Sequence, residues 1–363
     1  MQGMNFLFRL PLLSLCLASF PVAVSGGETT ALFAEEDRLH TVLTAPLSQA
    51  YKQKSLEQRL YMDGKWSYKL DDGTTKRLEL KIRTRGNFRR HNCTLPPLRL
   101  NFRKKALADT IYDGQNKLKM VSPCQAGDRY QQLIMAEYLS YKLFELLSDY
   151  HFKVRLVDVG YADTDQGLKP WSSTNFLIED VKDMAGRYDL KEQKIEQPDR
   201  QNFDLGQSAI VELFQYMIGN TDYSTLLGAN GDNCCHNARL LAEGESGKNL
   251  LPVAYDFDST GLVNAPYALP PANLPIKRVR VRYFTGWCKQ EHHYQAAIER
   301  FVERKDAALA LFSESDLLDE RTRKSTVGYL EDFYKVIENP KKVQKKILDR
   351  CRGEVIVDAA DSA

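Results

Sequence analysis

The sequence has almost no excess of charge of either sign, and it lacks a long apolar segment beyond residue 26. Lysine and arginine number 50 against 48 acidic residues, which leaves a formal net charge of +2 over 363 residues. Nucleic-acid-binding proteins usually carry a clustered basic excess, so this balance argues against a nucleic-acid partner. A membrane-spanning helix needs about 20 apolar residues, and no segment after residue 26 supplies them. Internal repeats and low-complexity blocks are lacking as well.

The first 26 residues have the features of a secretory signal peptide. Arg9 is the only charged residue before an almost wholly apolar run over residues 10–24, and Ala23 and Ser25 offer small side chains for cleavage. This order predicts removal of residues 1–26, a periplasmic or secreted location, and no transmembrane span afterwards. A retained N-terminal anchor is the alternative, although the apolar run is short for a membrane span.

Six cysteines remain once Cys16 is removed with the signal peptide: Cys93, Cys124, Cys234, Cys235, Cys288 and Cys351. An even number of cysteines in an oxidising compartment predicts disulfides. We expect Cys93 to pair with Cys124 in the N-terminal half, and the other four to form two bridges in the C-terminal half. A zinc site at Cys234-Cys235-His236 is the alternative, although adjacent cysteines lack the spacing usual in zinc sites.

Hydrophobic alternation predicts a sheet in the N-terminal half. Residues 28–60 are expected to be mixed helix. Residues 78–82 then alternate apolar and charged side chains, and this period of two marks a half-buried strand. Segments 98–102 and 117–121 alternate likewise, with turn signals such as Asp113-Gly114 near them. Short strands with hairpin-like connections predict an antiparallel sheet.

Longer patterns predict the remaining elements. A broad apolar stripe predicts a helix over residues 128–147. Within it, Glu137 is either a partner for a phosphate-binding lysine or a surface side chain. His292 and His293 are metal-ligand residue types, but neighbouring residues on a helix point apart. The further expected elements are paired strands at 152–159 and 173–180, a buried helix at 205–218, and helices from residue 294 onward.

Three polar residues, Asp222, Asn237 and Asp256, each lie beside a short apolar run. Phosphoryl-transfer enzymes present their polar groups in this way, with one aspartate deprotonating the acceptor hydroxyl while an asparagine and a second aspartate hold Mg²⁺. Mg²⁺ needs only a few such oxygens, because water and phosphate complete its coordination. The alternative is that these residues are ordinary turn residues.

A basic turn ends the strand at residues 78–82, with the sequence Arg85-Gly86-Asn87. Glycine lets the backbone approach a ligand closely, and arginine binds phosphate through two parallel hydrogen bonds. Lys119, on a later strand, is placed to hold phosphates in the way of a nucleotide-binding lysine. An ordinary basic turn and a solvated sheet face are the alternatives.

Taken in order, these motifs resemble the CotH-like family of atypical protein kinases. The matching segments are Arg85-Gly86-Asn87, Pro97-Leu98-Arg99-Leu100-Asn101-Phe102, Glu179, Asn220-Thr221-Asp222-Tyr223, His236-Asn237 and Tyr255-Asp256-Phe257-Asp258. The resemblance covers roughly residues 75–265. It implies an α+β, two-lobed protein-kinase-like fold, with an antiparallel N-lobe sheet over residues 27–180 and a mainly helical C-lobe over 181–363.

The same resemblance implies a role for each matching residue. Asp222 would be the catalytic base, and Asn237 and Asp256 would hold Mg²⁺ or Mn²⁺ with Asp258 as an auxiliary ligand. The residues implied to bind ATP or another nucleotide are Arg85, Asn87, Lys119 and Glu179. The chain departs from the family in having Phe88 where serine is usual, and in lacking a Gly-x-Gly-x-x-Gly loop.

Two functions from different classes follow. The first is an exported phosphotransferase that moves a nucleotide phosphate to a protein or cell-envelope acceptor. The second is a non-catalytic periplasmic or extracellular binding protein with the same fold. The presence of all three of Asp222, Asn237 and Asp256 favours the first, because a scaffold alone does not need them.

Overall fold

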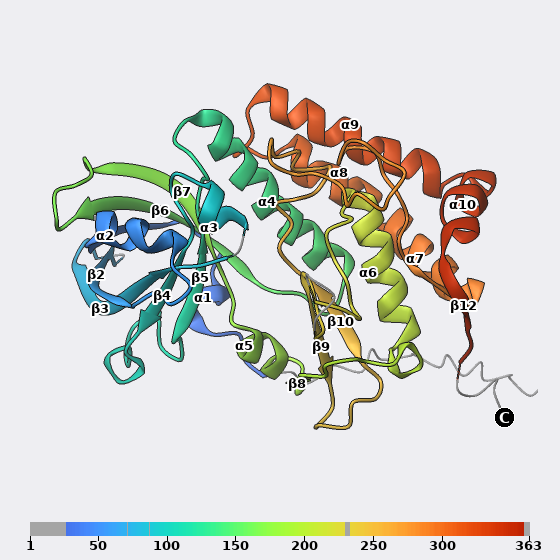
Figure 1. Ribbon diagram of the computed structural model, residues 1–363, viewed down its shortest axis with the longest axis horizontal. Helices are drawn as coiled ribbons and strands as arrows, with labels where there is room; N and C mark the ends of the chain where they lie inside the picture. The colour runs from blue at the N-terminus through green and yellow to red at the C-terminus, as the bar shows by residue number, and fades with distance from the viewer. Residues whose placement is uncertain (1–26, 71, 87, 229–232, 359–363) are drawn as a thin grey trace, which may run out of the picture.

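The computed structural model describes residues 27–70, 72–86, 88–228 and 233–358. The predicted signal peptide, residues 1–26, lies outside these ranges. Figure 1 shows the strands of the N-terminal half at one end of the molecule and the helices of the C-terminal half at the other. One long helix, α4 (Asp128–Leu147), lies between the two groups.

Seven strands of the described residues close into a barrel. In their order around the barrel they are β1 (Leu39–Ala45), β2 (Met62–Lys69), β3 (Thr75–Thr84), β4 (Leu98–Phe102), β5 (Lys117–Val121), β7 (Trp171–Ile178) and β6 (Val154–Asp163). Neighbours pair antiparallel except at the closure. There β6 and β1 run parallel, with Leu39 opposite Val157. The sheet is therefore both closed and mixed.

The predicted two-lobed protein-kinase-like fold with an antiparallel N-lobe sheet is wrong, because the main sheet is this closed mixed barrel. The expectation of mixed helix over residues 28–60 misses β1, which pairs with both β2 and β6. The fully buried positions of β1 are Thr41, Leu43 and Ala45. Only one of them is strongly apolar, so the period of two is weak. The parallel partner of β1 lies far along the chain, where no local pattern reports it.

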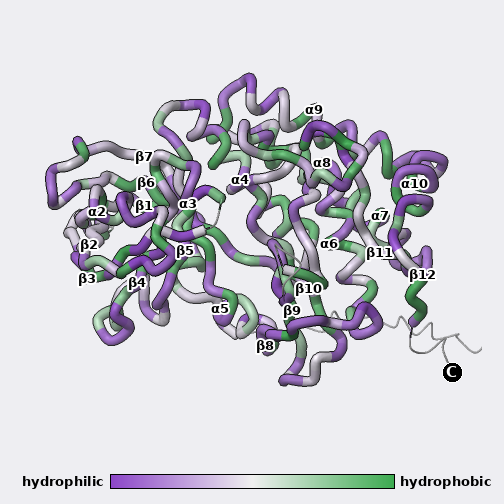
Figure 2. The backbone as a smooth tube through the Cα atoms, in the orientation of Figure 1, coloured by the Kyte–Doolittle hydropathy of each residue, from purple (hydrophilic) through white to green (hydrophobic). Residues whose placement is uncertain are grey.

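Most individual elements do agree with the sequence patterns. The alternating segment 78–82 lies in β3, where Leu78, Leu80 and Ile82 are buried. The long helix α4 and the buried helix α6 (Leu205–Ile218) are confirmed. The C-terminal helices are α7 (Glu291–Glu303), α8 (Lys305–Ser313), α9 (Glu320–Ile337) and α10 (Pro340–Lys346). Figure 2 colours α10 hydrophilic, in agreement with its basic sequence.

Smaller sheets and helices complete the fold. A three-stranded sheet has the order β10 (Leu251–Ala254), β9 (Ala238–Ala242), β8 (Lys191–Glu192). Strand β11 (Trp287–Lys289) pairs in parallel with β12 (Arg352–Ile356). The short helices are α1 (Ala31–Ala34), α2 (Leu47–Lys52), α3 (Phe88–Asn92) and α5 (Val181–Gly186).

Two large apolar cores stabilise these elements. The barrel interior is filled mainly by aliphatic side chains together with a group of aromatic rings, and Trp66 Nε1 donates a 2.8 Å hydrogen bond to the hydroxyl of Tyr112 there. The second core packs α4 against α6 and α9, with the rings of Phe144 and Phe214 4.6 Å apart. Burial of a phenylalanine side chain contributes about 1.5–3 kcal/mol. Figure 1 shows α4 running from beside the barrel towards the helices of the C-terminal half.

The described residues contain three disulfides, Cys93–Cys124, Cys234–Cys235 and Cys288–Cys351. The predicted pairing of Cys93 with Cys124 and the two bridges in the C-terminal half are confirmed. The alternative zinc site at Cys234-Cys235-His236 is wrong, because both sulfurs are bonded to each other. Disulfides of this number are consistent with an extracytoplasmic location. In the part of the chain that the structure describes, no helix combines the length and the hydrophobicity needed to cross a bilayer.

The disulfides should differ in their effect on stability. Cys93 and Cys124 are 31 residues apart, and a bridge over a loop of that length contributes about 3–4 kcal/mol in the chain-entropy model. We expect Cys93→Ala/Cys124→Ala to lower the free energy of unfolding by about that amount. Cys234→Ala/Cys235→Ala is the matched control, because its bridge closes almost no loop. Urea denaturation measures both, and equal losses would contradict the expectation.

Candidate functional site

The β9–β10 pair brings two of the predicted site residues to one edge of a sheet. The strands are antiparallel and Ala238 lies opposite Ala254, so the start of β9 meets the end of β10. Asn237 directly precedes β9, and Asp256 follows β10 by two residues. Both have left-handed backbone conformations, with φ of 48° and 65°, which asparagine and aspartate tolerate better than most residues. The backbone of Tyr255 donates a 3.2 Å hydrogen bond to the carbonyl of Asn237.

Helix α6 delivers the third residue, Asp222. Asp204 caps the start of the helix, and Gly219 ends it with a left-handed φ of 66°. A Cβ at Gly219 would lie 2.1 Å from the hydroxyl of Tyr329, so only glycine fits. The next turn is fixed by Asn220, whose side-chain oxygen accepts a 2.8 Å hydrogen bond from the backbone N–H of Asp222. The position of Asp222 is therefore set by the helix end.

These two elements meet at Asp222. The side-chain amide of Asn237 donates to the backbone carbonyl of Asp222 at 2.6 Å and to its Oδ2 at 3.3 Å. His236 Nε2 lies 2.8 Å from Asp222 Oδ1. The hydrogen bond to Asp222 raises the pKa of His236, with the charge of Asp222 adding to it. The Asp222 side chain is 42% exposed, so a substrate group has access to it.

Asp256 and Asp258 lie on either side of Phe257, which is fully buried. The Phe257 ring packs 4.6 Å from the ring of Tyr141 on α4. The hydroxyl of Tyr141 also accepts a 2.8 Å hydrogen bond from the backbone N–H of Asp256. Asp258 is buried and accepts a 3.0 Å hydrogen bond from Tyr267. Burial of Phe257 thus holds both carboxylates in place.

A buried arginine joins this acidic segment to the barrel end of the molecule. Arg89, in α3, lies 3.8 Å from Asp258 Oδ2 and 3.5 Å from Glu137 Oε2 of α4. Burial raises the pKa of Asp258 to about 6, and the nearby charge of Asp256 raises it further while Arg89 opposes both. Burial likewise raises the pKa of Glu137 well above its usual value. Among the described residues, Glu137 Oε1 is buried with no hydrogen-bond partner.

Basic side chains gather next to this edge. Lys119 of β5 lies over the ring of Tyr255, with Nζ 4.5 Å from the ring centre, and Arg239 covers the same ring at 4.9 Å. Burial lowers the pKa of Lys119 to about 7, and the charges of Arg85 and Arg239 lower it as well. Lys119 and Arg239 line a cavity of about 550 Å³, together with Arg99 and others. The lining also contains acidic residues, and Arg239 lies 3.5 Å from one of them, Glu192.

The residues predicted to bind a nucleotide have different surroundings in the structure. Arg85 is half-buried and close enough to Lys119 to lower its pKa, while Asn87 lies outside the described residues. Glu179 is buried, and Arg187 binds both of its carboxylate oxygens at 2.9 Å. That carboxylate is occupied within the protein, although Glu179 is among the residues lining the cavity. Glu137 contacts Arg89, and neither of its expected surroundings, a lysine partner or the surface, is found.

The predicted metal ligands fit a magnesium-like ion only in part. The carboxylates of Asp222, Asp256 and Asp258 do not all come within 4.8 Å of one another in the described structure. A protein cage for the ion is therefore not formed by these carboxylates. Mg²⁺ often takes one or two carboxylates together with water and phosphate oxygens, and the repulsion between Asp256 and Asp258 favours a cation nearby. Asn237 and Asp256 lie at one edge of the β9–β10 sheet, and with Asp258 they are residue types that suit that looser coordination.

Sequence reasoning missed Arg89, Tyr267 and the contact of His236 with Asp222. Arg89 and Tyr267 lie outside the segments expected to act, and no spacing signal links them to Asp258. His236 stands beside Asn237 in the sequence, which was the one available signal. No model of a known protein family matches the chain, and no curated protein matches it either.

The pKa of Lys119 gives a pH-dependent stability. Its folded pKa of about 7 lies below the usual value of a lysine, so above pH 7 the unfolded chain binds the proton that the folded chain has released. Stability therefore rises with pH from about 7 towards 10. We expect wild type to gain about 1–2 kcal/mol relative to Lys119→Met between pH 7 and 9, as measured by urea denaturation. Lys117→Met is the control, because Lys117 lies on the same strand and lines the same cavity. If wild type gained as much stability relative to Lys117→Met as relative to Lys119→Met, the assignment to Lys119 would be contradicted.

Proposed function

We propose that the protein is an exported, divalent-metal-dependent phosphotransferase that moves a nucleotide phosphate to a protein or cell-envelope acceptor. The observation that carries the proposal is the contact between Asp222 and Asn237, which reach each other from the end of α6 and the start of β9. Asp256 lies at the same edge of the β9–β10 sheet. The proposal is based on the residues of the site and not on the fold, because the same chemistry occurs on many unrelated folds.

Asp222 is the proposed base. Its side chain is partly exposed. The hydrogen bond with His236 orients the Asp222 carboxylate. The hydrogen bonds from Asn237 Nδ2 to Asp222 fix the Asn237 amide. Because the amide nitrogen donates to Asp222, the amide oxygen is the atom that would ligate a cation. Asp222 is then left to take the proton of an acceptor hydroxyl.

Asp256 and Asp258 are the proposed carboxylate ligands of Mg²⁺ or Mn²⁺, beside the amide oxygen of Asn237. Bound metal would neutralise charge on the transferred phosphate. Arg89 balances the charge of Asp258 and Glu137 on the buried side. Asp256 is therefore a stronger candidate for a direct metal ligand than Asp258, whose charge Arg89 already balances.

Lys119, Arg85 and Arg239 are proposed to hold the phosphates of ATP or another nucleotide. Burial is the main cause of the lowered pKa of Lys119, and the charges of Arg85 and Arg239 lower it further while Asp256 raises it. A polyphosphate in the cavity of about 550 Å³ would relieve that repulsion. The cavity volume is also within the usual range for a small-molecule site.

A periplasmic or secreted location completes the proposal. The apolar run over residues 10–24 supports export, and three disulfides among the described residues support an oxidising compartment. A protein or envelope molecule outside the cytoplasm is the acceptor class that such a location offers.

Two substitutions separate catalysis from binding. Asp256→Asn should weaken metal-dependent ATP binding and abolish transfer, because it removes a ligand charge. Asp222→Asn should keep ATP affinity within about threefold but slow transfer by about 10²–10⁴-fold, the usual contribution of a general base. Calorimetry with Mg²⁺ and ATP measures binding, and phosphate release or autophosphorylation measures transfer.

Asp63→Asn is the matched control, because Asp63 is an exposed aspartate on the barrel that pairs with Lys81. It should behave as wild type in both assays. Wild-type protein that binds ATP without transfer would favour the non-catalytic binding protein. Wild-type protein that does neither would contradict the nucleotide assignment altogether.

A further inference from the structure

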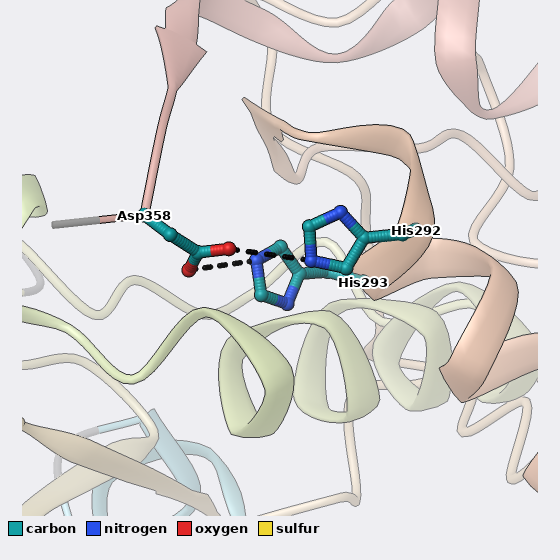
Figure 3. Close-up of side chains that lie close together, drawn as sticks. All are labelled: His292, His293 and Asp358. Carbon is teal, nitrogen blue, oxygen red and sulfur yellow. Dashed lines mark hydrogen bonds and ion pairs between the residues drawn. The ribbon is translucent and has the colours of Figure 1, made fainter. Parts of the chain in front are cut away.

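Two histidines and an aspartate meet at the start of α7, away from the site described above. His292 and His293 lie in the first turn of the helix, and Asp358 follows strand β12. His292 Nε2 is 3.3 Å from Asp358 Oδ2, and His293 Nε2 is 3.1 Å from Asp358 Oδ1. Figure 3 shows both rings directed at the same carboxylate. Within the described residues, this is the group of three His, Cys, Asp or Glu whose ligand atoms all lie within 4.8 Å.

The expectation that His292 and His293 point apart is wrong here. Their ring centres are 4.0 Å apart. The expectation holds for neighbours along the side of a helix, whereas these rings both turn towards Asp358 at the helix start (Figure 3). The third residue, Asp358, lies near the C-terminal end of the described chain, so no local sequence pattern links it to the two histidines.

We propose that His292, His293 and Asp358 bind one zinc-class transition-metal ion. Two imidazole nitrogens and a carboxylate are a common ligand set for Zn²⁺ and related ions. Ligand atoms around a tetrahedral zinc ion lie about 3.3 Å apart, given bonds of about 2.0–2.1 Å. The two nitrogen–oxygen distances are close to that separation and end on different oxygens of the Asp358 carboxylate, and one ligand atom from each residue lies within 4.8 Å of the others. The His292 side chain is 58% exposed, which leaves room for a water molecule as fourth ligand.

The ligands lie on connected elements. The backbone N–H of Asp358 donates a 2.9 Å hydrogen bond to the side-chain oxygen of Gln290, and the backbone of Gln290 donates to Ile356. Strand β12 is also paired with β11 and tied to it by the Cys288–Cys351 disulfide. The fold itself thus holds the carboxylate beside both rings, which lowers the ordering cost of binding a metal ion.

A bound ion would fasten the end of β12 to the start of α7. Its role is structural, because the proposed phosphotransfer residues belong to other segments of the chain. It also differs in metal class, since Mg²⁺ prefers oxygen ligands whereas imidazole suits zinc. This inference does not depend on the proposed function.

Zinc titration of the untagged, EDTA-treated protein with its disulfides intact tests the inference. Excess Mg²⁺ in the buffer occupies oxygen-rich sites. We expect one Zn²⁺ per chain by calorimetry and a higher melting temperature with Zn²⁺. His292→Gln and Asp358→Asn should each weaken Zn²⁺ binding at least tenfold and remove the thermal shift.

His40→Gln is the matched control, because His40 also contacts a single carboxylate, Asp158, at 3.4 Å on the barrel. It should bind Zn²⁺ as wild type does. His292 is largely exposed, so its variant should fold normally, and circular dichroism verifies this. Absence of Zn²⁺ binding by wild type, or equal affinity in folded wild type and His292→Gln, would overturn the inference.

Discussion

The buried guanidinium of Arg89 is the interaction on which the candidate site depends. It lies between Glu137 of α4 and Asp258 after β10, so three separate segments share one charge cluster. A buried carboxylate without a partner is costly, and removal of one member of such a cluster typically costs about 3–5 kcal/mol. Arg89 therefore lets two carboxylates remain buried beside Asp256. Without it, the pKa values of both buried acids would rise further and the carboxyls would take up protons.

The position of Arg89 is itself fixed by a covalent bond. Its helix, α3, is followed at once by Cys93, whose backbone N–H donates to the Arg89 carbonyl at 2.9 Å. Cys93 is bonded to Cys124, shortly before α4 begins. The disulfide thus joins the helix carrying Arg89 to the approach of the helix carrying Glu137. The Cys93–Cys124 disulfide therefore supports the charge cluster formed by Arg89, Glu137 and Asp258.

Local patterns in the sequence predicted local structure well. The alternation in β3 and the stripes of α4 and α6 each depend on neighbouring residues, and these elements are confirmed. Barrel closure depends on the pairing of Leu39 with Val157, and no pattern within β1 specifies so distant a partner. The kinase-like architecture was inferred from motif order, which carries no information about how a sheet closes.

The same division applies to the site. Asp222 and Asn237 were predicted together and lie in contact, because their positions follow from a helix end and a strand start that the sequence marks. Glu179 was expected to bind a cofactor, but its carboxylate is held by Arg187. Both roles place a buried glutamate after a strand, so the sequence does not distinguish them. The role of the glutamate depends on which group binds its carboxylate, and tertiary structure determines that group.

Charge separation across the site follows from these contacts. Arg89 offsets acids on the α4 side, while Lys119, Arg85 and Arg239 crowd together on the cavity side. The charge of Asp256 acts on both groups, raising the pKa of Asp258 and of Lys119. An anion in the cavity would relieve repulsion among the bases, and a cation near Asp256 would relieve repulsion among the acids. A metal–polyphosphate complex would supply both charges in one ligand, and this is the electrostatic argument for the proposed nucleotide.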